Sequence, residues 1–157
     1  MNPIASGKAN TLEILVIKLQ DLQFCVRTTS IREIRGWSPV TPLPYTPYEM
    51  VGISNLRGTV IPIIDLAIKL GLPRIEATER SAIVVAEVDG AVIGLLVDGV
   101  SDIMTVSADL LQPVPPAASV SAEFSDGIIT QGAAMICFLN LEKMFGDSGH
   151  GYYAHAA

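Results

Sequence analysis

The sequence has few side chains that could carry out acid–base or metal chemistry. Its only histidines, His150 and His155, stand near the C-terminus, so a Ser-His-Asp or Cys-His pair would lack a base in the body of the chain. The two cysteines, Cys25 and Cys137, lie in separate apolar runs, which does not fit a thiolate zinc site and favours buried reduced thiols over a disulfide. No glycine-rich loop opens a helix in the pattern that binds phosphate. We therefore expect no catalysis, no metal and no cofactor.

Three aspartates are candidates for paired catalytic carboxylates. Asp65, Asp98 and Asp102 each close or follow an apolar run, where a carboxylate more often accepts backbone N–H groups in a turn. We expect this turn role, and an enzyme that uses buried carboxylates is the weaker alternative.

Basic residues are scarce and unevenly placed. Ten Lys and Arg against 16 Asp and Glu give a net charge of −6 and a pI near 4.7. This balance argues against nucleic-acid binding, which depends on clustered basic side chains at phosphates. Residues 1–78 hold eight basic and six acidic residues, whereas residues 79–157 hold two and ten, so the two halves suit partners of different charge.

Long apolar runs are also missing. The richest, Ala91–Val97, is ended by Asp98 and is far shorter than the ~20 residues of a membrane span. The N-terminus has neither the basic region nor the apolar run of a signal peptide. We therefore expect the chain to stay in the cytoplasm without inserting into a membrane.

The chain contains one structural unit written twice. Apolar, β-branched runs predict a β-hairpin over 12–26 and a second over 81–97, the latter with Asp89-Gly90 as a type I′ turn. One constant shift in numbering superimposes these hairpins and also the strands after them, 31–34 and 100–103.

The end of the unit is repeated as well. A proline-rich crossing follows in both copies, and regular strands stop there. Beyond it, a slightly larger shift aligns 60–66 with 135–141, because the second crossing is longer. Each copy then ends in a short helical turn with a glycine, Gly71 or Gly146, as its C-cap.

This organisation predicts an all-β fold. Each copy supplies about five short strands separated by turn signals, which favours small closed barrels because closure hides strand edges. We predict two five-stranded barrels packed side by side, 12–73 and 81–145, which share a contact face and can exchange a terminal strand. The join is expected at 74–80, and 1–11 and 146–157 are expected to be flexible tails.

The segment Val51–Leu66, with Asn-Leu-Arg-Gly followed by Pro and Asp-Leu, closely resembles the CheW family of chemotaxis coupling proteins. Ile31–Gly36 and Val92–Ile103 look like further motifs of that family, and the resemblance spans 12–145 as one CheW-like domain. It implies barrels of the SH3-like type and a scaffold without catalysis.

The resemblance also implies partners. CheW-like proteins link transmembrane chemoreceptors to the histidine kinase CheA, whose regulatory domain shares the double-barrel fold. We therefore expect an adaptor that binds this regulatory domain and the cytoplasmic tip of methyl-accepting chemoreceptors, recruited from the cytoplasm to membrane-associated arrays. A coupling protein of a related chemosensory array that controls pili or other outputs is the alternative, and a purely structural dimer is a third.

Candidate contact residues lie on the repeated strand and in one turn. Arg57 should project from a turn at a barrel end, either in a local salt bridge or carbonyl cap, or in contact with a partner. Glu33 points outward if Ile34 points inward, and Ile31 then shares its face by the period-two rule. An exposed apolar residue beside an acid suits docking on a receptor tip.

The second copy has matching candidates. Val100 and Ile103 either line a groove between the barrels or belong to the core. Gly52 is more typical of a backbone demand, such as a bulge or a close strand approach, than of contact with a ligand. Trp37 either anchors a partner or covers a barrel mouth. The residues expected at the receptor or kinase surface are Ile31, Glu33, Gly52, Arg57, Val100 and Ile103.

Overall fold

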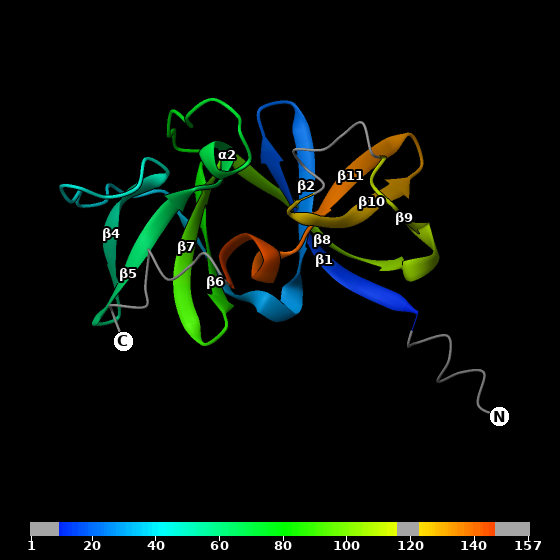
Figure 1. Cartoon of the computed structure of the whole chain (residues 1–157), viewed down its shortest axis with the longest axis horizontal. Helices are drawn as coiled ribbons and strands as arrows, with labels where there is room; N and C mark the ends of the chain where they lie inside the picture. Colours follow the sequence, from blue (N-terminus) through cyan, green and yellow to red (C-terminus); the bar gives the residue numbers. More distant parts are fainter. Residues whose placement is uncertain (1–9, 116–122, 147–157) are drawn as a thin grey trace.

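The fold is described from a computed structural model, which places residues 10–115 and 123–146. It is built mainly of β-strands arranged in two sheets (Figure 1), which confirms the predicted all-β class. Of the predicted tails, 1–11 and 146–157, only Asn10, Thr11 and Gly146 lie within the described residues, and the last two belong to a strand and a helix.

The order of elements repeats as the sequence predicts, except that the second copy has an additional two-residue strand and thus six strands in place of five. The strands of the first copy are β1 (Thr11–Leu19), β2 (Leu22–Arg27), β3 (Ile31–Gly36), β4 (Met50–Leu56) and β5 (Thr59–Asp65). Those of the second are β6 (Ala82–Val88), β7 (Ala91–Val97), β8 (Gly99–Ser107), β9 (Leu111–Gln112), β10 (Ser125–Gln131) and β11 (Ala134–Leu139). The short helices are η1 (Thr28–Ser30), α2 (Leu66–Lys69), η2 (Ala108–Leu110) and η3 (Glu142–Gly146). The predicted helical turn after each copy is thus present as α2 and η3.

The duplication extends to the irregularities of the sheets. β3 skips Arg32 in its pairing with β6, and β8 skips Ser101, the equivalent residue of the second copy, in its pairing with β1. In the same way β4 skips Val51 against β5, and β10 skips Asp126 against β11. Because bulges bend and twist a strand locally, both copies bend at the same places.

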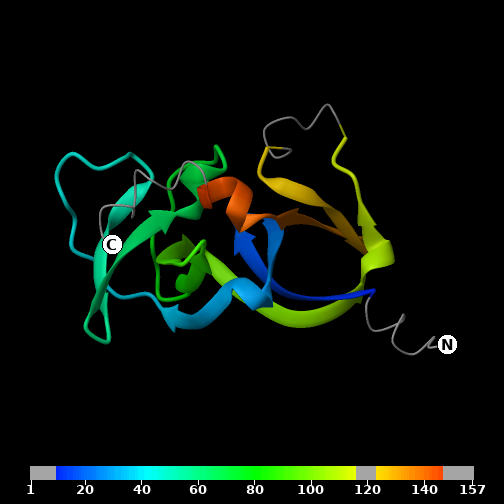
Figure 2. The ribbon, with the colours of Figure 1, turned by 60° about the horizontal axis from the view of Figure 1, so that its bottom comes forward.

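The sheets do not follow the boundaries of the sequence repeats. The five-stranded sheet has the order β3-β6-β7-β5-β4, and the six-stranded sheet has the order β8-β1-β2-β11-β10-β9. Each sheet therefore combines strands of both copies (Figure 2), joined by the parallel pairs β5–β7 and β2–β11 and by the antiparallel pairs β3–β6 and β1–β8. Neither sheet is built from 12–73 or 81–145 alone, and what crosses between copies is a whole hairpin. Closure of each sheet into a barrel stays a prediction.

The core lies on both faces of the strands shared between the halves. Ile14 and Val16 of β1 join a smaller buried cluster with Phe138, whereas Leu15 and Ile17 join a larger cluster with the five-stranded sheet. A strand buried on both faces has no need of polar alternation, which explains the continuous apolar run of β1. Burying so many large side chains supplies the main driving force for folding.

The two cysteines lie on opposite faces of adjacent strands. Cys25 pairs with Phe138 and Cys137 pairs with Phe24 in the parallel ladder, so neighbouring positions on each strand send the two thiols to different sides. Both cysteines are free. Their side chains point apart, which is the wrong geometry for a disulfide.

Hairpin turns use the left-handed backbone region. Asp89 and Gly90 have φ of 50° and 82°, which confirms the predicted type I′ turn. Arg57 and Gly58 connect β4 to β5 with φ of 51° and 90°. Among the described residues, the helices are too short for an apolar membrane crossing.

Candidate interaction surface

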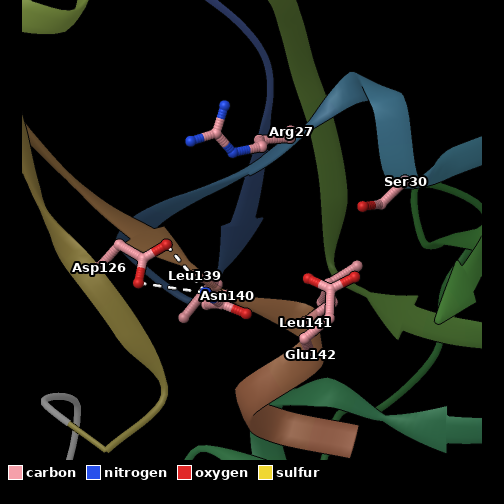
Figure 3. Close-up of a pocket in the computed structure, with 7 residues that line it drawn as sticks. All are labelled: Arg27, Ser30, Asp126, Leu139, Asn140, Leu141 and Glu142. Atoms are coloured by element: carbon pink, nitrogen blue, oxygen red, sulfur yellow. Dashed lines mark hydrogen bonds between the residues drawn. The ribbon is translucent and has the colours of Figure 1, made fainter. Parts of the chain in front are cut away.

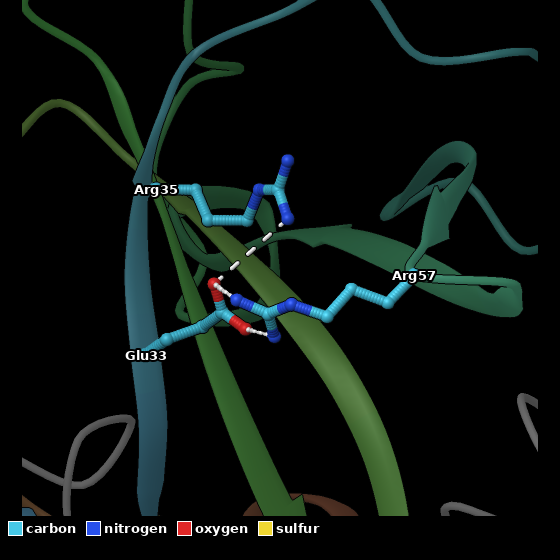
Figure 4. A network of polar contacts seen from close by, with 3 residues as sticks. All are labelled: Glu33, Arg35 and Arg57. Carbon is cyan, nitrogen blue, oxygen red and sulfur yellow. Dashed lines mark hydrogen bonds and ion pairs between the residues drawn. The ribbon is translucent and has the colours of Figure 1, made fainter.

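The β4–β5 turn aims the Arg57 side chain across the end of the five-stranded sheet. The Asn55 side-chain oxygen accepts the Gly58 N–H at 2.7 Å and so fixes the turn. From this position Arg57 Nη1 donates to Glu33 Oε2 at 2.5 Å and Nη2 donates to Glu33 Oε1 at 3.4 Å (Figure 4). Such a two-pronged contact holds both planar groups in one orientation.

Glu33 is also approached by a second arginine from its own strand. Arg35 Nη1 lies 3.8 Å from Glu33 Oε1, so one carboxylate faces two guanidinium groups, as Figure 4 shows. The side chain of Glu33 is 23% exposed, whereas that of Arg57 is 74% exposed. Arg57 therefore makes a salt bridge within the protein, and its guanidinium still presents most of its surface to solvent, so contact with a partner stays a prediction.

This ion pair connects the two edge strands of the five-stranded sheet. Glu33 lies on β3 at one end of the strand order, and Arg57 lies in the turn that joins β5 to β4 at the other end. Side chains thus connect end strands for which no backbone ladder is found among the described residues.

The predicted orientation of β3 is wrong in one respect. Ile31 pairs with Ala86, but Glu33 pairs with Val85, because the bulge at Arg32 adds a residue between them. Directly paired residues share a face, so Ile31 and Glu33 face opposite sides of the sheet. Ile31 packs against the larger core cluster, and Ile34, whose inward orientation was the condition of that prediction, is 41% exposed.

The corresponding strand of the second copy, β8, presents different side chains. Ile103, the equivalent of Ile34, is 55% exposed, which excludes the core interpretation for this residue. Val100 is half-buried against the larger core cluster, as Ile31 is. Asp102 occupies the place of Glu33 and is exposed, and no ion pair with it is found among residues 10–115 and 123–146.

Gly52 is placed by backbone demands, as the sequence suggested. It is buried, and a Cβ atom at this position would collide with the Thr41 carbonyl group. Its neighbour Ile53 exchanges two backbone hydrogen bonds with Thr41, at 2.8 and 2.9 Å. Gly52 therefore shapes the surface by letting the proline-rich crossing approach β4. Trp37 is half-buried and packs against the larger core cluster.

Two of the three aspartates have the predicted turn role. Asp65 is 1% exposed and accepts the N–H groups of Ile68 at 3.1 Å and Ile75 at 2.8 Å. Asp98 accepts the Gln20 N–H at 2.6 Å. Within the described part of the chain, no group of three or more metal-ligating side chains occurs.

The thiols are poorly suited to nucleophilic chemistry. Burial, reinforced by the nearby Cys137, raises the pKa of Cys25 to about 12. Burial also raises the pKa of Cys137, although a hydrogen bond with Ser125 opposes this shift. Because the thiolate is the reactive form and a raised pKa keeps the thiol protonated, both groups are poor nucleophiles near neutral pH.

Sequence reasoning missed the partners of these groups. Arg35 beside Glu33, and the pair of Arg32 Nη2 with Glu87 Oε1 at 2.5 Å, were not singled out. Alternating charges along β3 were the available signal, but the bulge decides which charge faces which neighbour.

Comparison with known proteins shows the family of the chain. The model of the family described as "CheW-like domain" matches residues 13–149. A protein of Rhizobium etli named "Probable chemotaxis protein CheW" is 45% identical over 137 residues, covering 87% of this chain and 88% of its own length. "Chemotaxis protein CheW" of Rhizobium meliloti is 44% identical, covering 85% and 86%. The crystal structure of the scaffolding protein TtCheW from Thermoanaerobacter tengcongensis superposes with a TM-score of 0.82 at 28% identity, covering 90% of this chain and 97% of that one. The chain belongs to the CheW-like domain family.

Proposed function

We propose that this protein is a non-catalytic adaptor of bacterial chemotaxis that couples transmembrane chemoreceptors to the histidine kinase CheA. The relatives named as chemotaxis proteins and the solved scaffolding protein support a scaffold role. The observation that carries the proposal is the exposed Arg57 guanidinium, held in a fixed orientation by Glu33 at the edge of the five-stranded sheet. Arginine is enriched among the residues that dominate the binding energy of protein contacts.

Two surfaces would carry the partners. The first contains Glu33 and Arg57 on the five-stranded sheet, with Gly52 shaping the adjoining loop. The second contains Ile103 on β8. Ile31 and Val100 are half-buried against the core where their strands begin, so they would support the strands that carry these surfaces.

Coupling would arise from simultaneous binding. An adaptor that holds the receptor tip with one surface and the kinase regulatory domain with the other raises their effective concentration for each other. Receptor state then reaches the kinase through differences in affinity or geometry across these contacts. No group of the adaptor needs to react with a substrate.

The charge pair sets the strength of the first contact. A partner carboxylate that approaches Arg57 excludes water from its guanidinium group. Truncation of one member of such a desolvated pair costs about 2–5 kcal/mol of binding free energy. The same truncation costs below about 1 kcal/mol of folding stability, because the pair is solvent-accessible in the free protein. Binding and stability should therefore separate.

The test is a binding assay with two purified partners, the kinase regulatory domain and a receptor cytoplasmic fragment. Arg57→Ala and Glu33→Ala should each weaken binding of at least one partner more than ten-fold. Arg80→Ala, which removes another exposed arginine, is the matched control and should bind like wild type. Absence of binding to both partners by the wild-type protein would refute the proposal.

The proposal also assigns a location. The adaptor would act in the cytoplasm and be recruited to membrane-associated receptor arrays by its partners. A fluorescent fusion should form clusters that disperse when the receptors are deleted. Clusters that persist without receptors would contradict recruitment through this contact.

A further inference from the structure

A small polar pocket opens at the end of β2 and β11, away from the Glu33–Arg57 pair. Its cavity is about 30 Å³, and its walls include Arg27, Ser30, Asn140 and Glu142 (Figure 3). The Asn140 side chain caps η3 by accepting the Lys143 N–H at 3.0 Å. This space is that of a single water molecule, so the pocket suits one polar group.

The equivalent place in the other half is already covered. Asp65, which aligns with Asn140 in the repeat, caps α2 by accepting the N–H of Ile68 in the same i+3 geometry. The N–H of Asp65 donates to Glu49 O, and that of Asn140 donates to Phe124 O, the equivalent carbonyl group of the second copy. The two sites therefore correspond in backbone geometry.

The cover is a segment of the linker between α2 and β6 that forms neither helix nor strand. Ile75 N–H donates to Asp65 Oδ2 at 2.8 Å, and the Ile75 side chain is buried. Further along, the Arg80 carbonyl oxygen lies over Gly99, the equivalent of Ser30. The first site is thus closed by a peptide segment that brings one N–H and one side chain. Within the described residues, nothing closes the second.

The side chains around the two sites differ in kind. Arg27 stands where the first site has Leu96, and Glu142 stands where it has Ala67; both Leu96 and Ala67 are fully buried. The Arg27 guanidinium is held 5.2 Å from the centre of the Phe138 ring, and no carboxylate pairs with it among the described residues. A polar site with a positioned guanidinium calls for a polar, acidic occupant.

Acceptors for a backbone N–H are present as well. The Asn140 side-chain amide donates to both oxygens of Asp126, at 3.1 and 2.9 Å, and Lys143 Nζ lies 3.1 Å from Asp126 Oδ1. A carboxylate has about four lone-pair positions, so Asp126 can accept a further donor. Figure 3 shows Asp126 below Arg27 on one side of the pocket, with the Ser30 hydroxyl on the other side.

We propose that this pocket binds an extended segment of a partner protein that bears an acidic side chain. The acidic side chain of the partner accepts hydrogen bonds from the Arg27 guanidinium. The partner's backbone passes over Asn140 as residues 72–75 pass over Asp65. This would be a third contact site, distinct from the two surfaces of the proposed function, and it does not depend on them.

The experiment uses the full chain and a labelled peptide copied from Gly71–Glu76 that carries Ile75→Glu, which places the acid where the internal cover has its buried side chain. Fluorescence anisotropy should show saturable binding that weakens about ten-fold or more in Arg27→Gln, because a charge-assisted contact is lost. The peptide with the natural isoleucine should bind more weakly. Circular dichroism confirms that each variant is folded.

Control variants separate the alternatives. Arg27→Lys keeps the charge without the fork and should give intermediate binding, and Arg80→Gln should bind like wild type. Glu33→Ala should also leave peptide binding unchanged, so failure of this site is distinguishable from failure of the proposed function. Equal binding by Arg27→Gln and wild type would overturn the proposal. Binding that appears only in a chain ending at Gly146 would also overturn it, because residues 147–157 would then be the occupant.

Discussion

The two halves of this protein, each built around one sheet, share the same backbone arrangement. They differ in the side chains that connect their strands and in what covers their helix caps. In the five-stranded half, Glu33 and Arg57 connect the end strands. In the six-stranded half the equivalent positions hold Asp102 and Gly132, so the same connection is impossible. Gly132 keeps a positive φ of 59°, close to the 51° of Arg57. Duplication therefore preserved the turn conformation and let the side-chain chemistry diverge.

The caps of the two short helices show the same divergence. Asp65 is sealed under Ile75, and Asn140 lines an open pocket. A buried charged cap needs all of its acceptors occupied, whereas an accessible amide can be satisfied by water. We therefore expect interaction surfaces where a site that is covered in one half of the protein is left open in the other half.

The largest expected difference between the halves concerns these caps. Asp65→Ala removes the acceptor for two backbone N–H groups, one of them buried, and should lower the free energy of unfolding by about 3 kcal/mol. Asn140→Ala should cost about 1 kcal/mol, because its cap is accessible. Urea denaturation of both variants measures the contrast. Equal losses would show that burial of the first cap is unimportant.

The crossing over β4 gives the next effect. Gly52→Ala should destabilise the protein by about 2 kcal/mol, because the new methyl group meets the Thr41 backbone and the loop must shift. Gly36→Ala is the matched control, since a Cβ there meets nothing within 4 Å. Thermal unfolding should separate the two variants by several degrees. A neutral Gly52→Ala would contradict the close approach.

A third contrast depends on pH. Cys25 of the first copy corresponds to Gly94 of the second copy, so only the first copy has a thiol that can ionise at this position. Its pKa is raised by burial from 9.0 to about 12, so the unfolded chain loses this proton first as pH rises. Stability linked to Cys25 is complete below pH 9 and falls between about pH 9 and 12. Cys25→Ala should show a shallower loss in alkaline urea titrations. An unchanged slope would mean that the thiol ionises equally in both states.

The smallest expected effect is on folding through the ion pair. Reversing both charges, with Glu33→Arg and Arg57→Glu together, should change stability by less than about 1 kcal/mol. Asp102→Asn in the other half should have no measurable effect. Chemical denaturation of these variants, with the single reversals included, completes a double-mutant cycle. A coupling of several kcal/mol would reveal that the pair is needed to close the sheet.

The sequence was sufficient for some of these features and not for others. Hairpins, the Asp89-Gly90 turn and the repeated order of elements follow from local patterns that neighbouring residues decide. Exchange of a terminal strand between the copies was predicted, but exchange of a whole hairpin was not, because β1–β2 and β6–β7 have similar apolar patterns and either could pair with either copy. Such choices depend on the whole fold.

The candidate surface was predicted in part. Arg57 was placed correctly in a turn and Glu33 on a strand, but their contact joins residues 24 positions apart and needs the sheet geometry. The face of Ile31 was wrong because one bulge reverses the alternation that the period-two rule assumes. The pocket at Arg27 gave no sequence signal, since strands of both copies form it.

The most direct measurement is chemical-shift mapping of the isotope-labelled protein with the kinase regulatory domain and the receptor fragment added separately. The account predicts that one partner perturbs amides around Glu33 and Arg57, and that the other perturbs amides around Ile103 on β8. Perturbations centred on α2 and the linker, with β3, β8 and the β4–β5 turn silent for both partners, would contradict it.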